Sequence, residues 1–237
     1  MSKKIYKAIV TGGTRGIGFE IAKRLHADGI NVIATGTKAN GIPPKGVGYY
    51  EVDFLNDESV SKFIKFIKKS KIDILVNNAG INKINKFAEI NPDDFDQIIR
   101  VNLRTPFLLC QAAIPNMQKN NWGRIINVTS IFGTISKEYR ASYSASKFAL
   151  DGLTIALSAE VSELGILANS VAPGFINTDL TNKVLGQDGI SKLQDRIPIK
   201  RLGEPNEIAS IVSWLVSDQN TYMSGQNLVV DGGFSRV

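Results

Sequence analysis

Residues 7–29 read KAIVTGGTRGIGFEIAKRLHADG, and this stretch decides which fold the chain is expected to adopt. A short apolar run, KAIV, passes through glycines 12, 16 and 18 into the amphipathic run FEIAKRLHADG. A strand that turns through glycines into a helix directs free backbone N–H groups and the positive end of the helix dipole at a phosphate group. A Gly-rich loop alone is often a plain turn. Its place between a strand and a helix favours nucleotide binding here.

The rest of the chain alternates short apolar runs with longer amphipathic stretches, an order typical of parallel strands joined by helical crossovers. The predicted strands cover residues 5–10, 30–35, 47–52, 72–76, 124–129, 166–171 and 227–230. The predicted helices cover about 17–28, 57–69, 93–119 with an interruption, 142–164 and 205–217. We therefore expect an α/β fold, a single Rossmann-like doubly wound parallel sheet of about seven strands with helices on both faces. Ligands of such sheets bind beyond the carboxyl ends of the strands.

One predicted crossover is too short for a regular helix. Residues 36–46 read GTKANGIPPKG and include Pro43 and Pro44. Proline and glycine in such a short segment disfavour a helix, so we expect a loop or one helical turn. No internal repeat or linker appears elsewhere, and residues 1–237 are expected to form one domain.

The composition limits the partners. Hydrophobic residues make up 43% and charged residues 21% of the chain, which is typical of globular proteins. No apolar run approaches the roughly 20 residues needed to cross a bilayer, and the chain meets its first glycine turn too early for a signal peptide. We expect a cytoplasmic protein without a membrane partner. The single Cys110 and single His26 favour structural roles and argue against a disulfide or a metal site.

The formal net charge of +6 raises the question of nucleic acid. Lysines in the second predicted helix recur at helical spacing opposite apolar residues, which indicates a solvated helix face. No basic tract is interleaved with aromatic residues. We expect no nucleic-acid partner, although a basic balance favours small anionic ligands.

Residues 142–148 read SYSASKF and place Tyr143 four residues before Lys147. On a helix the two side chains share one face. A free tyrosine has a pKa of about 10, and a neighbouring ammonium would lower it toward a useful catalytic range. Ser130 precedes Tyr143 by thirteen residues at the end of a predicted strand and would stand beside it. A Tyr–Lys pair alone is usually structural, so the interpretation rests on the combination with the Gly-rich loop.

Several motifs now occur in one order: TGGTRGIG at 11–18, NNAG at 77–80, VN at 101–102, TS at 129–130, YSASK at 143–147, APG at 172–174 and SGQNLVVDGG at 224–233. The chain resembles the short-chain dehydrogenases/reductases over essentially its whole length. It is similar in particular to the branch of 3-oxoacyl-acyl-carrier-protein reductases and glucose dehydrogenases.

The resemblance implies a role for each central residue. Tyr143 would be the general acid in carbonyl reduction and the base in alcohol oxidation. Lys147 would lower the pKa of Tyr143 and bind the nicotinamide ribose. Ser130 would hold the substrate oxygen, and Asn102 would hold a water of the proton relay. No metal is implied. The implied cofactor-binding residues are Gly12, Thr14, Arg15, Gly16, Ile17, Gly18, Thr37, Lys38, Asp53, Phe54, Asn78, Ala79, Gly80, Tyr143, Lys147, Pro173, Gly174, Ile176 and Thr178.

The end of the second predicted strand bears on the choice of cofactor. NAD-binding sheets usually carry an acidic residue there for the ribose 2′-hydroxyl, but this chain reads ATGTK at 34–38. Arg15 and Lys38 would instead attract a 2′-phosphate. Lys38 can also be an ordinary loop lysine. We expect NADP(H) in preference to NAD(H).

The substrate is less constrained. Residues 179–200 are expected to be a mobile lid. Lys137 and Arg140 favour a carboxylate- or phosphate-bearing substrate, and solvent-facing charges or subunit contacts are an equal alternative. The expected activity interconverts a ketone and a secondary alcohol, on a carrier-bound 3-oxoacyl group or on a sugar or hydroxy acid of a polysaccharide pathway. A catalytically silent nucleotide sensor or scaffold is the non-enzymatic alternative. The resemblance also implies a homotetramer or homodimer.

Overall fold

The computed structural model of the protein describes residues 5–237, without the side chains of residues 180, 184 and 185. Seven strands form one sheet in the order β3-β2-β1-β4-β5-β6-β7, and every neighbouring pair is parallel. The expected fold class is confirmed. The strands are β1 (Lys7–Val10), β2 (Asn31–Gly36), β3 (Gly48–Glu51), β4 (Ile74–Asn77), β5 (Gly123–Val128), β6 (Ile166–Pro173) and β7 (Asn227–Val230).

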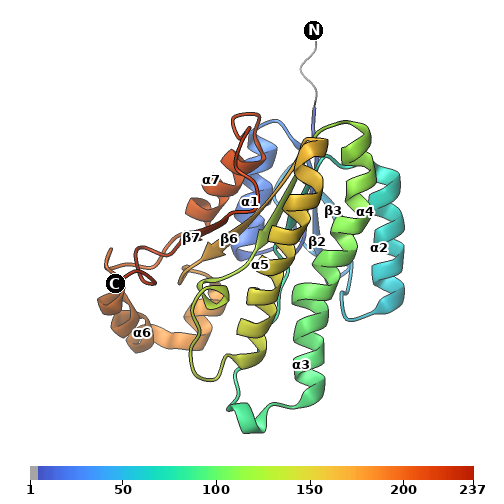
Figure 1. Ribbon diagram of the computed structural model, residues 1–237. Helices are drawn as coiled ribbons and strands as arrows, with labels where there is room; N and C mark the ends of the chain where they lie inside the picture. Colours follow the sequence, from blue (N-terminus) through green and yellow to red (C-terminus); the bar gives the residue numbers. More distant parts are fainter. Residues whose placement is uncertain (1–4) are drawn as a thin grey trace.

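Helices cover both faces of the sheet (Figure 1). The α-helices are α1 (Gly16–Ala27), α2 (Asp57–Ser70), α3 (Pro92–Ile99), α4 (Thr105–Lys119), α5 (Ala141–Val161), α6 (Asp179–Arg196) and α7 (Pro205–Val216). Helices α1 and α7 pack together over one apolar core, and α2, α4 and α5 lie over a second core on the other face. Each face therefore has its own core, and the ligand-binding edge stays at the carboxyl ends of the strands.

The predicted interruption within 93–119 is a π-helix. Residues Arg100–Arg104 wind as η2 between α3 and α4. Such π-segments inside α-helices occur frequently at functional sites, and this one carries Asn102. Short 3₁₀ turns complete the fold at η1 (Phe87–Glu89), η3 (Ile131–Gly133) and η4 (Ser162–Leu164).

The connection between β2 and β3 contains no helix, as expected. Pro44 and Val47 are buried, and Val47 joins the core beneath α1. The Tyr49 hydroxyl donates a hydrogen bond to the carbonyl oxygen of Lys38, which fixes the loop over the strand that follows it. A packed loop thus covers the flank of α1 that a crossover helix would otherwise cover.

The segment expected only as a lid contains a helix that the sequence analysis did not predict. Thr178 caps α6 by accepting a hydrogen bond from the Thr181 N–H at 3.2 Å. Gly186 has φ 63° and ψ 177°, so α6 is two short helices joined at a kink. Two glycines in DLTNKVLGQDG mask the helical pattern. In Figure 1 α6 lies beyond β6 and β7, near the C-terminus. Among residues 5–237, no helix is long and apolar enough to cross a membrane.

Candidate active site

The central residues meet at the carboxyl edge of the sheet. Ser130 follows the end of β5, and Tyr143 and Lys147 lie one turn apart in α5. The side chains of Ser130 and Tyr143 are hydrogen-bonded. The Lys147 ammonium nitrogen lies 5.6 Å from the centre of the Tyr143 ring. The structure therefore brings these three sequence-predicted residues into one cluster.

The acidity of the Tyr143 hydroxyl departs from the expectation. Burial raises the pKa of Tyr143 above its ordinary value, and the hydrogen bond from Ser130 and the charge of Arg140 lower it only in part. The net direction is opposite to the lowering expected from Lys147. The Lys147 ammonium donates a hydrogen bond to the Val128 carbonyl at 2.8 Å, and burial lowers the pKa of Lys147 itself to about 8. The Lys147 ammonium is thus hydrogen-bonded to the backbone, and its burial disfavours the charged form.

Asn102 fastens the edge of the site through its side chain. Its Oδ1 accepts a hydrogen bond from the Ile81 N–H at 2.9 Å, and its Nδ2 donates to the Ile81 carbonyl at 2.9 Å and the Ser146 hydroxyl at 3.1 Å. Both amide hydrogens are therefore committed to protein atoms. Any water held by this residue must use the remaining Oδ1 lone pair or the backbone carbonyl. The side chain ties the turn after β4 to α5.

The Gly-rich loop has the geometry of a phosphate cradle. Gly12 and Gly16 have φ of 65° and 54°, which favours glycine. A Cβ atom on Gly18 would clash with the Gly12 carbonyl oxygen and with Nδ2 of Asn78. The N-cap residue Arg15 makes no side-chain hydrogen bond to the first turn of α1. The open helix N-terminus fits a pyrophosphate group.

The end of β4 is bonded to the end of β1. The Thr11 hydroxyl accepts hydrogen bonds from the N–H groups of Asn78 at 2.9 Å and Ala79 at 3.0 Å. A Cβ atom on Gly80 would lie 3.6 Å from the Lys147 ammonium. The predicted cofactor-binding run 78–80 is thus continuous with the catalytic cluster.

Two further predicted cofactor residues lie beyond β6. A Cβ on Gly16 would lie 3.5 Å from the Thr178 methyl group, so the residues before α6 adjoin the cradle. Ile176 forms a parallel bridge with Gly203. The bridging bonds use the Phe175 carbonyl and the Asn177 N–H. In parallel pairing this directs the backbone groups of Ile176 to the opposite side, where a carboxamide could bond them.

Other predicted cofactor residues serve the fold. Phe54 is buried in the core beside Phe63, at 6.1 Å between ring centres, and its predicted cofactor contact stays a prediction. Gly174 follows Pro173 where a Cβ would lie 2.7 Å from the Asp231 Cα, so chain packing alone requires glycine. Asp53 is exposed, and its Oδ1 accepts a hydrogen bond from the Leu55 N–H at 2.9 Å.

The residues near the expected 2′-phosphate are open to solvent. Arg15, Thr37 and Lys38 are all exposed. Within residues 5–237 neither Arg15 nor Lys38 forms an ion pair with a carboxylate, so these two cations are available to a ligand. Thr14 and Ile17, the remaining predicted loop residues, are half-buried beside the glycines.

The two predicted substrate residues differ in environment. Lys137 is exposed and lies 3.8 Å from Glu138. Arg140 is half-buried, and its guanidinium carbon lies 5.8 Å from the centre of the Phe132 ring. Burial lowers the pKa of Arg140. Lys137 therefore lies near an acidic neighbour on the surface, whereas the Arg140 guanidinium lies against the site.

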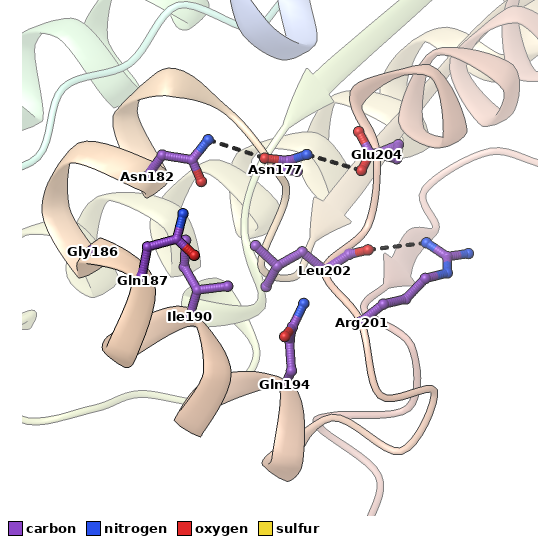
Figure 2. Close-up of a pocket in the computed structure, with 9 residues that line it drawn as sticks. All are labelled: Asn177, Asn182, Gly186, Gln187, Ile190, Gln194, Arg201, Leu202 and Glu204. Atoms are coloured by element: carbon purple, nitrogen blue, oxygen red, sulfur yellow. Dashed lines mark hydrogen bonds between the residues drawn. The ribbon is translucent and has the colours of Figure 1, made fainter.

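A cavity of about 480 Å³ lies under α6 and was not foreseen. Figure 2 shows a chain of hydrogen bonds across it, from Asn182 Nδ2 to Asn177 Oδ1 at 3.1 Å and from Asn177 Nδ2 to Glu204 Oε1 at 3.0 Å. Amide side chains carry no periodic signal, so this cavity could not be predicted from the sequence. The lining residues are Asn177, Asn182, Gly186, Gln187, Ile190, Gln194, Arg201, Leu202 and Glu204.

The sheet, the glycine cradle and the Ser–Tyr–Lys cluster define an oxidoreductase of the short-chain dehydrogenase/reductase class. The chain belongs to this family: the family model described as Enoyl-(Acyl carrier protein) reductase matches residues 12–235. It is 37% identical to the 3-oxoacyl-(acyl-carrier-protein) reductase FabG of Aquifex aeolicus, over 95% of this chain and 96% of the relative. It is 40% identical to FabG of Salmonella typhimurium, over 97% of each.

Solved structures agree with this class. A proposed NAD(P)-dependent gluconate 5-dehydrogenase from Beutenbergia cavernae, with bound NADP, superposes with a TM-score of 0.91 at 30% identity, over 98% of this chain and 97% of the other. A 4-hydroxyisoleucine dehydrogenase in complex with NADH also superposes with a TM-score of 0.91, at 29% identity over 98% and 99%.

Proposed function

We propose that the protein interconverts a ketone and a secondary alcohol with NADP(H), using Tyr143 as the general acid and base. The observation that supports this most directly is the hydrogen-bonded Ser130–Tyr143 pair above the buried Lys147, directly beside the glycine cradle. A silent nucleotide sensor would not need this cluster intact.

The protonation state of Tyr143 suits a general acid at neutral pH. The bound nicotinamide would supply or accept the hydride. Because burial raises the pKa of Tyr143, its hydroxyl keeps its proton at neutral pH and can donate it to a carbonyl oxygen. Ser130 would hold that oxygen by a second hydrogen bond. Lys147 would bind the ribose, and Asn102 would keep the turn at Ile81 in register with α5.

Three facts support NADP(H) as the cofactor. The β2 end offers no carboxylate for a ribose 2′-hydroxyl, and Arg15 and Lys38 are exposed cations near that position. One structural relative holds NADP, whereas another holds NADH. The fold therefore accepts both dinucleotides, and the two cations of this chain favour the phosphorylated one.

Two substrate classes are candidates. The curated relatives support a 3-oxoacyl group on an acyl carrier protein. The structural relatives named for gluconate and 4-hydroxyisoleucine support a small sugar acid or hydroxy acid, as in a polysaccharide pathway. The latter class is the second candidate because these compounds carry a carboxylate and Arg140 lies beside Tyr143.

We further propose that the chain works as one domain in the cytoplasm, with residues 179–200 as the lid. A homotetramer or homodimer is supported by apolar side chains on the outer faces of α4 and α5. The exposed ones include Phe107, Phe148 and Ile155. Light scattering of the purified protein measures the assembly.

The test of the reaction follows NADPH absorbance with 3-oxoacyl thioesters, sugar ketones and keto acids. Tyr143→Phe should lower kcat by about 10²–10⁴-fold, the usual contribution of a general acid, with the affinity for NADPH retained. Tyr139→Phe is the matched control, because this neighbouring tyrosine is exposed. Retained activity in Tyr143→Phe would refute the mechanism.

A further inference from the structure

Arg140 occupies a defined place beside the acid. It is the N-cap residue of α5, three positions before Tyr143. Residues at this spacing lie on the same side of a helix start. Its carbonyl oxygen accepts a hydrogen bond from the Ser144 N–H at 2.7 Å, which fixes the backbone. The charge of Arg140 acts directly on Tyr143.

Among residues 5–237 the guanidinium of Arg140 has no anionic partner. It lies over the Phe132 ring and interacts electrostatically with Tyr143. The buried Arg124, by contrast, donates to the carbonyls of Gly123 at 2.8 Å and Asn220 at 2.9 Å. The guanidinium nitrogens of Arg140 are not buried away from solvent, so its N–H groups stay open to a ligand anion.

The surface beneath Arg140 is rigid and apolar. The Phe132 ring meets the Phe175 ring edge-on at 6.0 Å, and Phe175 meets Phe234 edge-on at 5.0 Å. The Phe132 N–H donates to the Ser130 hydroxyl at 3.2 Å, so one short turn sets both the ring and the serine. With its central carbon 5.8 Å from the centre of the Phe132 ring, the guanidinium leaves its N–H groups for a planar anion. Carboxylates match these groups in a two-point contact.

Resting on the proposed function, we propose that Arg140 binds a carboxylate of the substrate, so that the enzyme prefers keto acids and hydroxy acids over their neutral analogues. Arg140 is then a specificity-determining residue, and Lys137 is not, because it is exposed and already lies near Glu138. This assignment favours the small-acid candidate over a neutral acyl thioester.

The test compares each keto acid of the screen with its methyl ester. In the parent protein kcat/KM should be higher for the acid. Arg140→Gln should lower kcat/KM for the acid by about 10–100-fold, the range for a lost hydrogen bond to a charged group, and change the value for the ester less than threefold. Arg140→Lys should restore part of the loss. Lys119→Gln removes one exposed charge at the far end of α4 and is the control.

A binding measurement tests carboxylate binding by Arg140 separately from the proposed reaction. In Tyr143→Phe with NADPH bound, the keto acid should raise the melting temperature more than its ester does, and the added change Arg140→Gln should abolish the difference. Binding of the keto acid without turnover in the parent protein would refute the proposed reaction. It would still support Arg140 as the residue that binds the carboxylate. Turnover with equal preference for acid and ester, or equal losses for both in Arg140→Gln, would refute the assignment alone.

Discussion

The ammonium of Lys147 donates a hydrogen bond to the carbonyl oxygen of Val128 at 2.8 Å, joining the middle of α5 to the end of β5. The ammonium lies inside the protein, with only 3% of the residue exposed. The site thus holds a charge that the surrounding protein disfavours, and this has a measurable consequence for stability.

The stability contributed by Lys147 should rise with pH. Burial lowers its pKa to about 8 from an ordinary value near 10.5, so between these values the unfolded chain binds more protons and the free energy of unfolding increases. Above about pH 10 the raised pKa of Tyr143 acts oppositely, because folded Tyr143 keeps a proton that the unfolded chain loses.

Denaturant unfolding of the cofactor-free protein and Lys147→Met measures the effect between pH 8 and 10. The free energy of unfolding of Lys147→Met, minus that of the parent, should fall by about 2 kcal/mol as the pH rises through this window. A difference that stays constant with pH would show that the buried lysine keeps its ordinary pKa.

Gly18→Ala should damage both folding and cofactor binding. The added methyl group would meet the Gly12 carbonyl and the Asn78 amide, and overpacking of this kind costs about 1–3 kcal/mol. We expect NADPH affinity, measured by fluorescence titration, to fall at least tenfold. Gly152→Ala is the matched control, because Gly152 lies on α5 and an added methyl group there would have no atom within 4 Å. The control variant should gain about 0.5–1 kcal/mol of stability. Equal losses of NADPH affinity in both variants would contradict phosphate binding by the Gly-rich loop.

Asn102→Ala should lower kcat while leaving the KM for NADPH nearly unchanged. The variant leaves the backbone groups of Ile81 without their buried partner, which costs about 1–3 kcal/mol of stability. The comparison is Asn206→Ala, an exposed residue on α7. Unaltered kcat and thermal stability in Asn102→Ala would remove its positioning role.

Arg15→Gln should reduce cofactor discrimination. A phosphate contact to a charged group is worth about 1.5–3 kcal/mol, so kcat/KM for NADPH should fall about 10-fold or more with little change for NADH. Lys38→Gln should have a smaller effect, because its flexible ammonium makes a point contact. If both variants keep the parent ratio of the two cofactors, these cations do not select the 2′-phosphate.

The sequence predicted the sheet well because most of its strands are short apolar runs bounded by turns and separated by helical stretches. The first strand was expected over 5–10 and begins at Lys7, a small error typical of strand ends. The helix α6 was missed because its glycines and polar residues hide the apolar period, although Thr178 was a visible cap signal.

Within the candidate site, the sequence predicted which residues meet but not their energetics. Tyr143, Lys147 and Ser130 converge because two of them share a helix face and the third ends a neighbouring strand. The direction of the Tyr143 pKa depends on burial by residues distant in sequence, which spacing does not reveal. Phe54 illustrates the same limit, since its backbone neighbourhood follows the family pattern while its ring belongs to the core.

The missing crossover helix between β2 and β3 has an electrostatic consequence. Without it, Arg15 and Lys38 are exposed to solvent, where mobile ions screen charges beyond roughly 10 Å at 0.1 M salt. The attraction between these two cations and a phosphate therefore depends on the ionic strength of the solution. The proposed preference for NADP(H) over NAD(H) should therefore depend on the salt concentration as well as on the residues, and should narrow as salt is added.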